Sequence, residues 1–311
     1  IDLKLSDLLE NIRVIPLETR PDILLPGYPS FWVGEKYIVT YGGDAMHLFT
    51  VDGKYVRKLA EQGRGPEEYL YAMGFSVDKQ ERYGYLADRN GCISVIDLEK
   101  GGIARRIPIG KNIPYNLCYS DKDSTLVYAP VGKDNLACTI YRIALDGTLL
   151  HTVESSSTSG ILRYLWCLND TMHYKMQLCD TLFWLADTVM IPYCRLVTEQ
   201  PISIVTGCGR TVGILLENKN RLVLSNDEVV NKKEEWGIST FIRPLGCYVL
   251  DKSDFSLRKV KGFYVDVFDY TRADMDYFPL EVVGKRACWK ISALEFKELL
   301  KDKLDSPWVP E

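Results

Sequence analysis

Side chains that could bind a ligand gather in one turn of this sequence, GRGPEEY at residues 63–69. The turn carries a guanidinium at Arg64, carboxylates at Glu67 and Glu68, and a phenol at Tyr69. Arginine offers planar donors to an acidic or hydroxylated ligand. The glycines and the proline are equally the residues that any sharp change of chain direction requires. The turn is therefore a candidate binding site and also a candidate structural turn.

Further oxygen ligands lie in other turns, at Asp44, Asn90, Asp134 and Asn135. A ring of carboxylates and amides could hold a hard cation such as calcium, or could hydrogen-bond a sugar. Polar residues of this kind are also common in any exposed turn. The sequence predicts polar turn residues here without assigning them a ligand.

Motifs of metal or catalytic chemistry are missing from the sequence. The three histidines form no HExxH motif, no GxSxG motif occurs, and none of the nine cysteines forms a CxxC pair. The run GCGRTVG at 207–213 has its third glycine one residue late for a dinucleotide site and precedes a strand pattern. We expect no catalytic residue, no metal and no cofactor.

The elements that position these turns repeat along the chain. Segments resembling FTVDG begin at residues 49, 95, 141, 183, 248 and 289, so the intervals are 46, 46, 42, 65 and 41 residues. A period in the forties, built of short strands and Gly/Asp turns, is typical of β-propeller blades. Within one period, residues 73–77, 83–87, the anchor segment and 103–109 each have a strand pattern. Six anchors with four strands each predict an all-β, six-bladed propeller of antiparallel blades, as a single domain over residues 1–311.

The long interval of 65 residues predicts an insertion of about twenty residues in the fifth blade. It lies between Leu224 and Gly246, in the connection from the second to the third strand. Long insertions in a compact fold are usually functional or disordered. Because Trp and Arg dominate binding hot spots, we expect this loop to cover the axial face with Trp236 or Arg243 lining a pocket.

The two ends of the chain predict how the ring closes. Residues 12–17 have a strand pattern outside any blade, and Pro16 suits an outermost strand that needs one fewer donor. We expect this strand to complete the sixth blade. The capping-box spacing at 292–295, followed by apolar residues at helical intervals, predicts a short C-terminal helix.

Four segments resemble a known family. The runs IPLET at 15–19, FTVDGKYVRK at 49–58 and GRGPEEY at 63–69 are similar to the six-bladed, NHL-like β-propeller proteins of Bacteroidetes, as is DTLF at 180–183. The resemblance covers most of the chain but rests on segments that build blades. It implies an exported lipoprotein of the periplasm or outer membrane, with a lipid anchor upstream of residue 1.

Composition limits the partners. The net charge of −4 and the pI near 5.6 argue against nucleic acid, and no apolar run approaches the roughly 20 residues that span a bilayer. We expect a monomeric, non-catalytic module that binds a protein, glycan or small molecule at the axial face. The alternative is a propeller enzyme, such as a calcium-assisted lactonase or a polysaccharide lyase.

Overall fold

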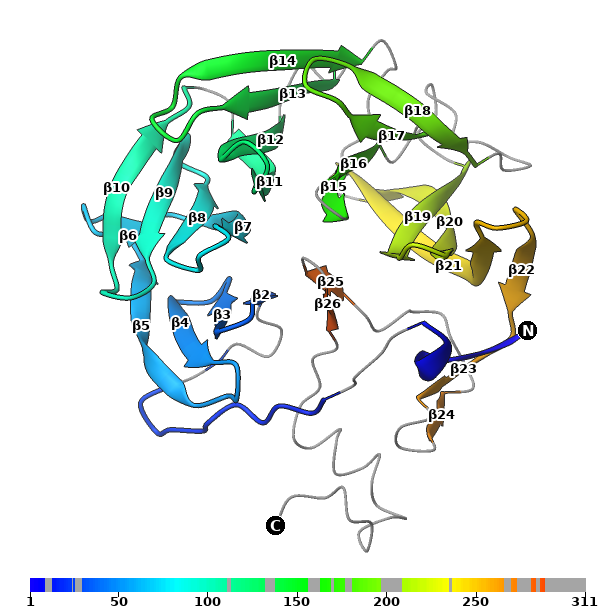
Figure 1. Cartoon of the computed structure of the whole chain (residues 1–311), viewed down its shortest axis with the longest axis horizontal. Helices are drawn as coiled ribbons and strands as arrows, with labels where there is room; N and C mark the ends of the chain where they lie inside the picture. The colour runs from blue at the N-terminus through cyan, green and yellow to red at the C-terminus, as the bar shows by residue number, and fades with distance from the viewer. Residues whose placement is uncertain are drawn as a thin grey trace, which may run out of the picture. The chain divides into compact units, whose positions relative to one another are not determined.

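The computed structural model of the chain is built of β-strands (Figure 1). It describes residues 1–8, 13–23, 25, 30–110, 113–131, 138–155, 163–168, 171–176, 181–196, 209–234, 237–265, 270–272, 281–283 and 286–288. In these residues every regular element is a strand, apart from the short 3-10 helix η1 (Leu5–Asp7). The all-β class is confirmed. The chain divides into two compact units, residues 15–206 and residues 1–14 with 207–311.

Four sheets make up the unit of residues 15–206. The first has the order β2 (Ser30–Val33), β3 (Tyr37–Tyr41), β4 (Ala45–Thr50), β5 (Tyr55–Gln62), β6 (Glu68–Tyr69). The second contains β7 (Ala72–Val77), β8 (Tyr83–Asp88), β9 (Cys92–Asp97) and β10 (Ile103–Pro108). The third contains β11 (Ile113–Ser120), β12 (Thr125–Val131), β13 (Cys138–Ile143) and β14 (Leu149–Ser155). The fourth contains β15 (Arg163–Leu168), β16 (Thr171–Met176), β17 (Thr181–Leu185) and β18 (Met190–Arg195).

These sheets resemble propeller blades in strand order and in packing. Each is an antiparallel meander, except that the two-residue strand β6 adds in parallel to the end of β5. Figure 1 shows the four sheets following one another, and β11 lies against both β7 and β15, the first strands of its neighbours. Between the first and second sheets, buried Val39, Leu48 and Phe75 share one apolar core with Leu86 and Ile96. Further apolar cores fill the space between the later sheets.

The repeat read from the sequence matches the third strand of each blade. The anchor segments at residues 49, 95, 141, 183 and 248 lie in β4, β9, β13, β17 and β21, each of which is third in its four-strand meander. The turn after β4 contains Gly53 with φ of +84°, a conformation that a side chain would disfavour. A sequence period built on Asp-Gly turns therefore located the strands correctly. The sixth anchor, at residue 289, lies outside the described residues.

The unit of residues 1–14 and 207–311 contains one complete meander and two smaller sheets. The meander is β19 (Gly209–Glu217), β20 (Arg221–Glu234), β21 (Gly237–Asp251) and β22 (Leu257–Val260). A second sheet has the order β1 (Asp2–Lys4), β23 (Gly262–Val265), β24 (Tyr270–Arg272), and β25 (Glu281–Val283) pairs with β26 (Arg286–Cys288). In the second sheet β1 pairs with β23 in parallel, so that Leu3 lies opposite Phe263.

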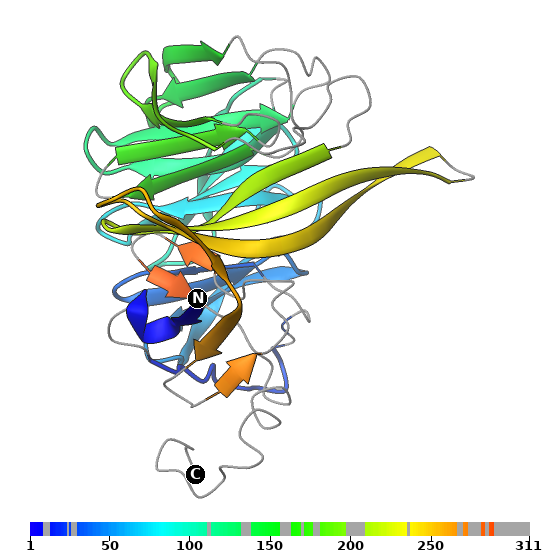
Figure 2. The ribbon, with the colours of Figure 1, turned by 90° about the vertical axis from the view of Figure 1, so that its right-hand side faces the viewer.

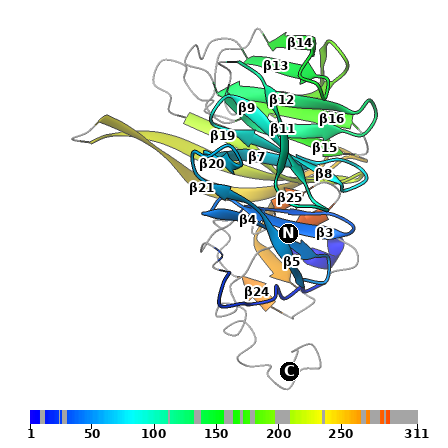
Figure 3. The same cartoon turned by 90° about the vertical axis from the view of Figure 1, so that its left-hand side faces the viewer.

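The insertion predicted for a fifth blade is a β-hairpin, which corrects the prediction of a loop. It does lie between the second and third strands, but β20 and β21 continue through it and pair from Arg221↔Asp251 to Glu234↔Gly237. In the described residues, the neighbouring strand β19 pairs with β20 as far as Val229, and β20 and β21 run on past its described end (Figures 2 and 3). The inserted backbone groups thus pair within the insertion itself. Their N–H and C=O groups therefore need no hydrogen bonds from a loop that folds back over the sheet.

The predicted strand at residues 12–17 is also corrected. Its described part, residues 13–17, forms no strand, and from Ile15 onward the chain lies against the turn between β4 and β5. The amide of Glu18 donates to the Gly53 carbonyl at 2.8 Å, and the Glu18 carboxylate accepts from the Tyr55 amide at 3.0 Å. Glu18 therefore forms its hydrogen bonds with a turn rather than with a neighbouring strand. The strand near the N-terminus is β1, and the predicted C-terminal helix at 292–300 lies outside the described residues.

Candidate functional site

The loop from Gly63 to Leu70, between β5 and β7, is folded by its own side chains. The Glu68 carboxylate accepts from the Gly65 amide at 2.7 Å, and the Glu68 amide donates to the Gly65 carbonyl at 3.2 Å. A Cβ atom at Gly63 would overlap the same carboxylate, so the loop closes tightly because residue 63 has no side chain. The backbone of Arg64 is thereby held at the tip of the loop.

A buried carboxylate joins this loop to the next turn. Asp88, at the end of β8, is fully buried and accepts from the amides of Leu70 at 3.1 Å and Tyr71 at 3.2 Å. In return, the Arg89 amide donates to the Tyr71 carbonyl at 3.1 Å. Buried N–H groups need acceptors, and one aspartate supplies them for two segments. The loop and the β8–β9 turn are consequently held side by side.

Tyr69 anchors the loop from below. Its ring is buried, and its hydroxyl donates to the Gly43 carbonyl at 2.9 Å in the β3–β4 turn. Burial, followed by the nearby Asp44 and Asp88 carboxylates, raises the pKa of Tyr69 to about 12. The phenol therefore stays neutral in the physiological range. Hydrogen bonds of the loop thus connect the three turns 42–45, 63–70 and 88–91.

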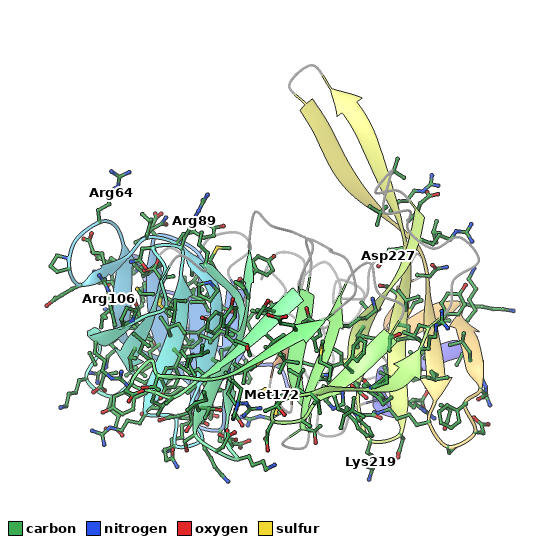
Figure 4. The ribbon with its side chains drawn as sticks, turned by 90° about the horizontal axis from the view of Figure 1, so that it is seen from above. Arg64, Arg89, Arg106, Met172, Lys219 and Asp227 are labelled. Carbon is green, nitrogen blue, oxygen red and sulfur yellow. The ribbon has the colours of Figure 1, made fainter. Side chains whose placement is uncertain are left out.

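A pocket of about 270 Å³ opens where the loop meets the β8–β9 turn. Its walls are Gly63 to Gly65, Glu68, Leu70, Asn90 and Arg106. Arg106 comes from β10, and its Nη2 atom donates to the Glu68 carbonyl. Asn90 is oriented by its side-chain oxygen, which accepts from the Cys92 amide at 3.2 Å. Figure 4 shows Arg64 pointing away from the loop and Arg106 lying lower, beside the strands.

Three predicted site residues meet in this pocket, namely Arg64, Glu68 and Asn90. Tyr69 lies beneath it as a buried anchor, and the exposed Asp44 lines neither described pocket. Arg243 is mostly exposed on the β20–β21 hairpin, where its guanidinium pairs with the Glu228 carboxylate. Asp134 and Trp236 lie outside the described residues. The pocket therefore contains part of the predicted set.

The sequence prediction missed Arg106 and Leu70. Arg106 lies in the middle of a strand, in the run IARRIP, which has the look of an exposed edge. The adjacent Arg105 provided a partial signal. Because consecutive strand residues point to opposite faces, Arg105 and Arg106 lie on different faces of β10. Arg105 is exposed and Arg106 is half-buried.

A second pocket, of about 430 Å³, lies in the other unit, between the β19–β20 turn, the β21–β22 turn and Asp7. Several of its charged groups have partners within the chain. Lys252 Nζ donates to the buried Glu217 carboxylate at 2.7 Å, and Arg221 Nη1 donates to the Asp7 carbonyl at 2.9 Å. These contacts fasten the two turns together. The side chains that line this pocket therefore act mainly to hold the two turns together.

Metal ligands do not cluster in the part of the chain that the structure describes: no group of three or more His, Cys, Asp or Glu side chains is found there. Among the same residues, no helix is long and apolar enough to cross a membrane. Burial raises the pKa of the Cys118 and Cys247 thiols to about 12. These two cysteines behave as buried apolar groups.

Comparison with known families identifies the chain. The profile described as "Domain of unknown function (DUF4934)" matches residues 1–236, more than half of the sequence. The chain belongs to the DUF4934 family. No curated protein matches this DUF4934 chain.

Solved structures share the fold. The crystal structure of a "putative exported protein" from Bacteroides fragilis is similar with a TM-score of 0.59 and 12% identity, over 83% of this DUF4934 chain and 79% of the other. The WD40 β-propeller domain of Doa1 aligns with a TM-score of 0.39 and 11% identity, over 72% and 78% of the two chains. At such identities the similarity to the Bacteroides fragilis protein is evidence for the fold alone. The similarity to Doa1 is too weak to support any conclusion.

Proposed function

We propose that this DUF4934 chain is an exported, non-catalytic binding protein whose ligand enters the pocket between the Gly63–Leu70 loop and Arg106. The observation that carries the proposal is convergence. Side chains from a loop, a hairpin turn and an outer strand line one pocket, and hydrogen bonds hold Glu68, Asn90 and Arg106 in place. Pre-organised polar groups of this kind provide specificity in small-molecule sites.

The proposal extends to the fold as a single six-bladed propeller closed by its two ends. Five four-strand meanders, a sequence period in the forties and the parallel pairing of β1 with β23 support it. Closure of a ring removes exposed sheet edges. Export is supported by the resemblance to exported Bacteroidetes propellers and by the structural similarity to the "putative exported protein" of Bacteroides fragilis.

The test uses thermal melting and NMR with a panel of neutral and acidic mono- and oligosaccharides and short peptides. Wild type is compared with Leu70→Trp, which fills the pocket from its partly exposed wall. A compound that raises the melting temperature of wild type but not of Leu70→Trp supports the proposal. Equal stabilisation of both proteins would place binding elsewhere and overturn the assignment of the pocket. A chemical change in the compound, seen by NMR, would overturn the non-catalytic part.

A further inference from the structure

Three arginines lie around the pocket on separate segments of the chain. Arg64 is at the tip of the loop, Arg106 lies in β10, and Arg89 is in the β8–β9 turn beside Asn90. Figure 4 shows Arg64 and Arg89 pointing outward at the same end of the sheets, with Arg106 beneath them. Guanidinium groups bind carboxylates and phosphates through two parallel donors.

Within the part of the chain that the structure describes, the side chains of these arginines pair with no carboxylate. Ion pairs between arginine and a carboxylate elsewhere in the described residues involve Arg20, Arg142, Arg221 and Arg243. Within the same described residues, the side chains of Arg64 and Arg89 have neither a hydrogen bond nor an ion pair. Arg106 donates to a backbone carbonyl, and its buried Nε has no acceptor there.

The carboxylate in the same pocket does not neutralise them. Glu68 is the acidic residue of the lining, yet its Oε2 atom accepts from the Gly65 amide and holds the loop closed. Arg64, Arg106 and Glu68 leave the lining with one net positive charge. A buried donor without an acceptor is unfavourable, and an incoming anion would supply the missing acceptor.

We propose that the pocket binds a monocarboxylate of sugar size, such as a sugar acid, clamped between Arg64 and Arg106. Arg89 attracts the anion from the rim, and Asn90 and Leu70 contact its uncharged body. A monoanion matches the single net charge, whereas a phosphate dianion would approach the Glu68 carboxylate with a second charge. This inference rests on the proposed function and names the ligand class of the same pocket.

The experiment measures binding of D-glucuronate, of D-glucose as its neutral counterpart, and of inorganic phosphate, by ligand-observed NMR on the full chain. We expect wild type to bind D-glucuronate and to bind the other two at least tenfold more weakly. Loss of one charge-assisted contact, in Arg64→Gln or Arg106→Gln, should weaken D-glucuronate binding about tenfold or more. Arg106→Lys keeps the positive charge but not the planar pair of donors, so it should restore only part of the affinity that Arg106→Gln loses.

Arg105→Gln is the matched control, because Arg105 is the exposed neighbour of Arg106 on β10 and does not line the pocket. It should bind like wild type. Arg64 has no described side-chain partner, so Arg64→Gln should keep the wild-type melting temperature and remains informative if Arg106→Gln unfolds.

Binding of D-glucose as tight as that of D-glucuronate, with loss in Leu70→Trp, would overturn the carboxylate and leave the pocket intact. Phosphate binding tighter than D-glucuronate binding would overturn the choice of a monoanion. D-Glucuronate binding that is absent in wild type, or unchanged in both arginine variants, would overturn the inference. Whether the pocket binds any ligand is tested independently, by comparing wild type with Leu70→Trp across the compound panel.

Discussion

The Gly63–Leu70 loop and the β20–β21 hairpin are two described segments that extend beyond a simple four-strand meander, and they are built in different ways. The loop has eight residues and, besides its internal hydrogen bonds, bonds to other segments through Asp88, Gly43 and Arg106. The hairpin is longer, and beyond Val229 its described strands pair only with each other. Convergence of separate segments makes a pocket, whereas length alone does not.

The largest effect is expected from Asp88→Ala, which tests whether the loop depends on its neighbours. The substitution leaves the buried amides of Leu70 and Tyr71 without their acceptor, at about 1–3 kcal/mol each. We expect urea denaturation to show a loss of about 3 kcal/mol or more. Asp187→Ala, at an exposed hairpin turn, should change stability by less than about 0.5 kcal/mol. Similar values for the two variants would contradict the role of Asp88.

Alkaline titration tests the buried anchor of the loop. Because the pKa of Tyr69 is about 12 in the folded chain and about 10 when unfolded, folding favours the neutral phenol. This contribution is complete below pH 10 and is lost as the pH rises towards 12, on the order of 2 kcal/mol. The difference in unfolding free energy between wild type and Tyr69→Phe should therefore change across this window. A constant difference from pH 9 to 12 would show that the phenol is not buried.

Gly63→Ala tests how tightly the loop closes. The added Cβ overlaps the Glu68 carboxylate, so Glu68 must release the Gly65 amide, at about 1–2 kcal/mol. In a Glu68→Ala background the same change should cost much less, since the overlapping atoms are gone. Additive losses in the double variant, measured by urea denaturation, would argue against this contact.

The smallest effect is expected when the hairpin is shortened. Replacing residues 230–241 by an Asn-Gly turn joins Val229 to Ile242, which already lie opposite each other in the ladder. We expect the unfolding free energy to change by less than about 1 kcal/mol and D-glucuronate binding to stay as in wild type. A loss of binding would move the site to the hairpin, where sequence reasoning first placed Trp236 and Arg243.

The fold was more predictable from the sequence than the site. Asp-Gly turns such as Asp52-Gly53 demand a backbone conformation that few residues adopt, so their spacing located the strands. Arg64, Glu68 and Asn90 could be grouped because alternating connections bring such turns to one end of a blade. Arg106 could not, because its place in the pocket depends on the register of β10 against β9, which no local pattern fixes.

The wrong predictions have a common physical origin. Residues 15–18 have strand-forming composition, but the carbonyl of Gly53 and the amide of Tyr55 offered them partners at a turn. The insertion was read as a loop because its length exceeds an ordinary connection, whereas β20 and β21 continue and satisfy its backbone. In both cases the choice of hydrogen-bond partner, rather than local propensity, decided the structure.

The pairing of β1 with β23 imposes an order of events during synthesis. Leu3 and Phe263 are opposite each other although 260 positions separate them. At about 5–20 residues per second, the ribosome needs roughly 13–50 s to make the partner strand after the first one. Throughout that interval the apolar side chain of Leu3, buried in the finished protein, has no sheet to enter. The sheet that contains β1 must therefore be among the last to form, and closing so long a loop makes that step slow.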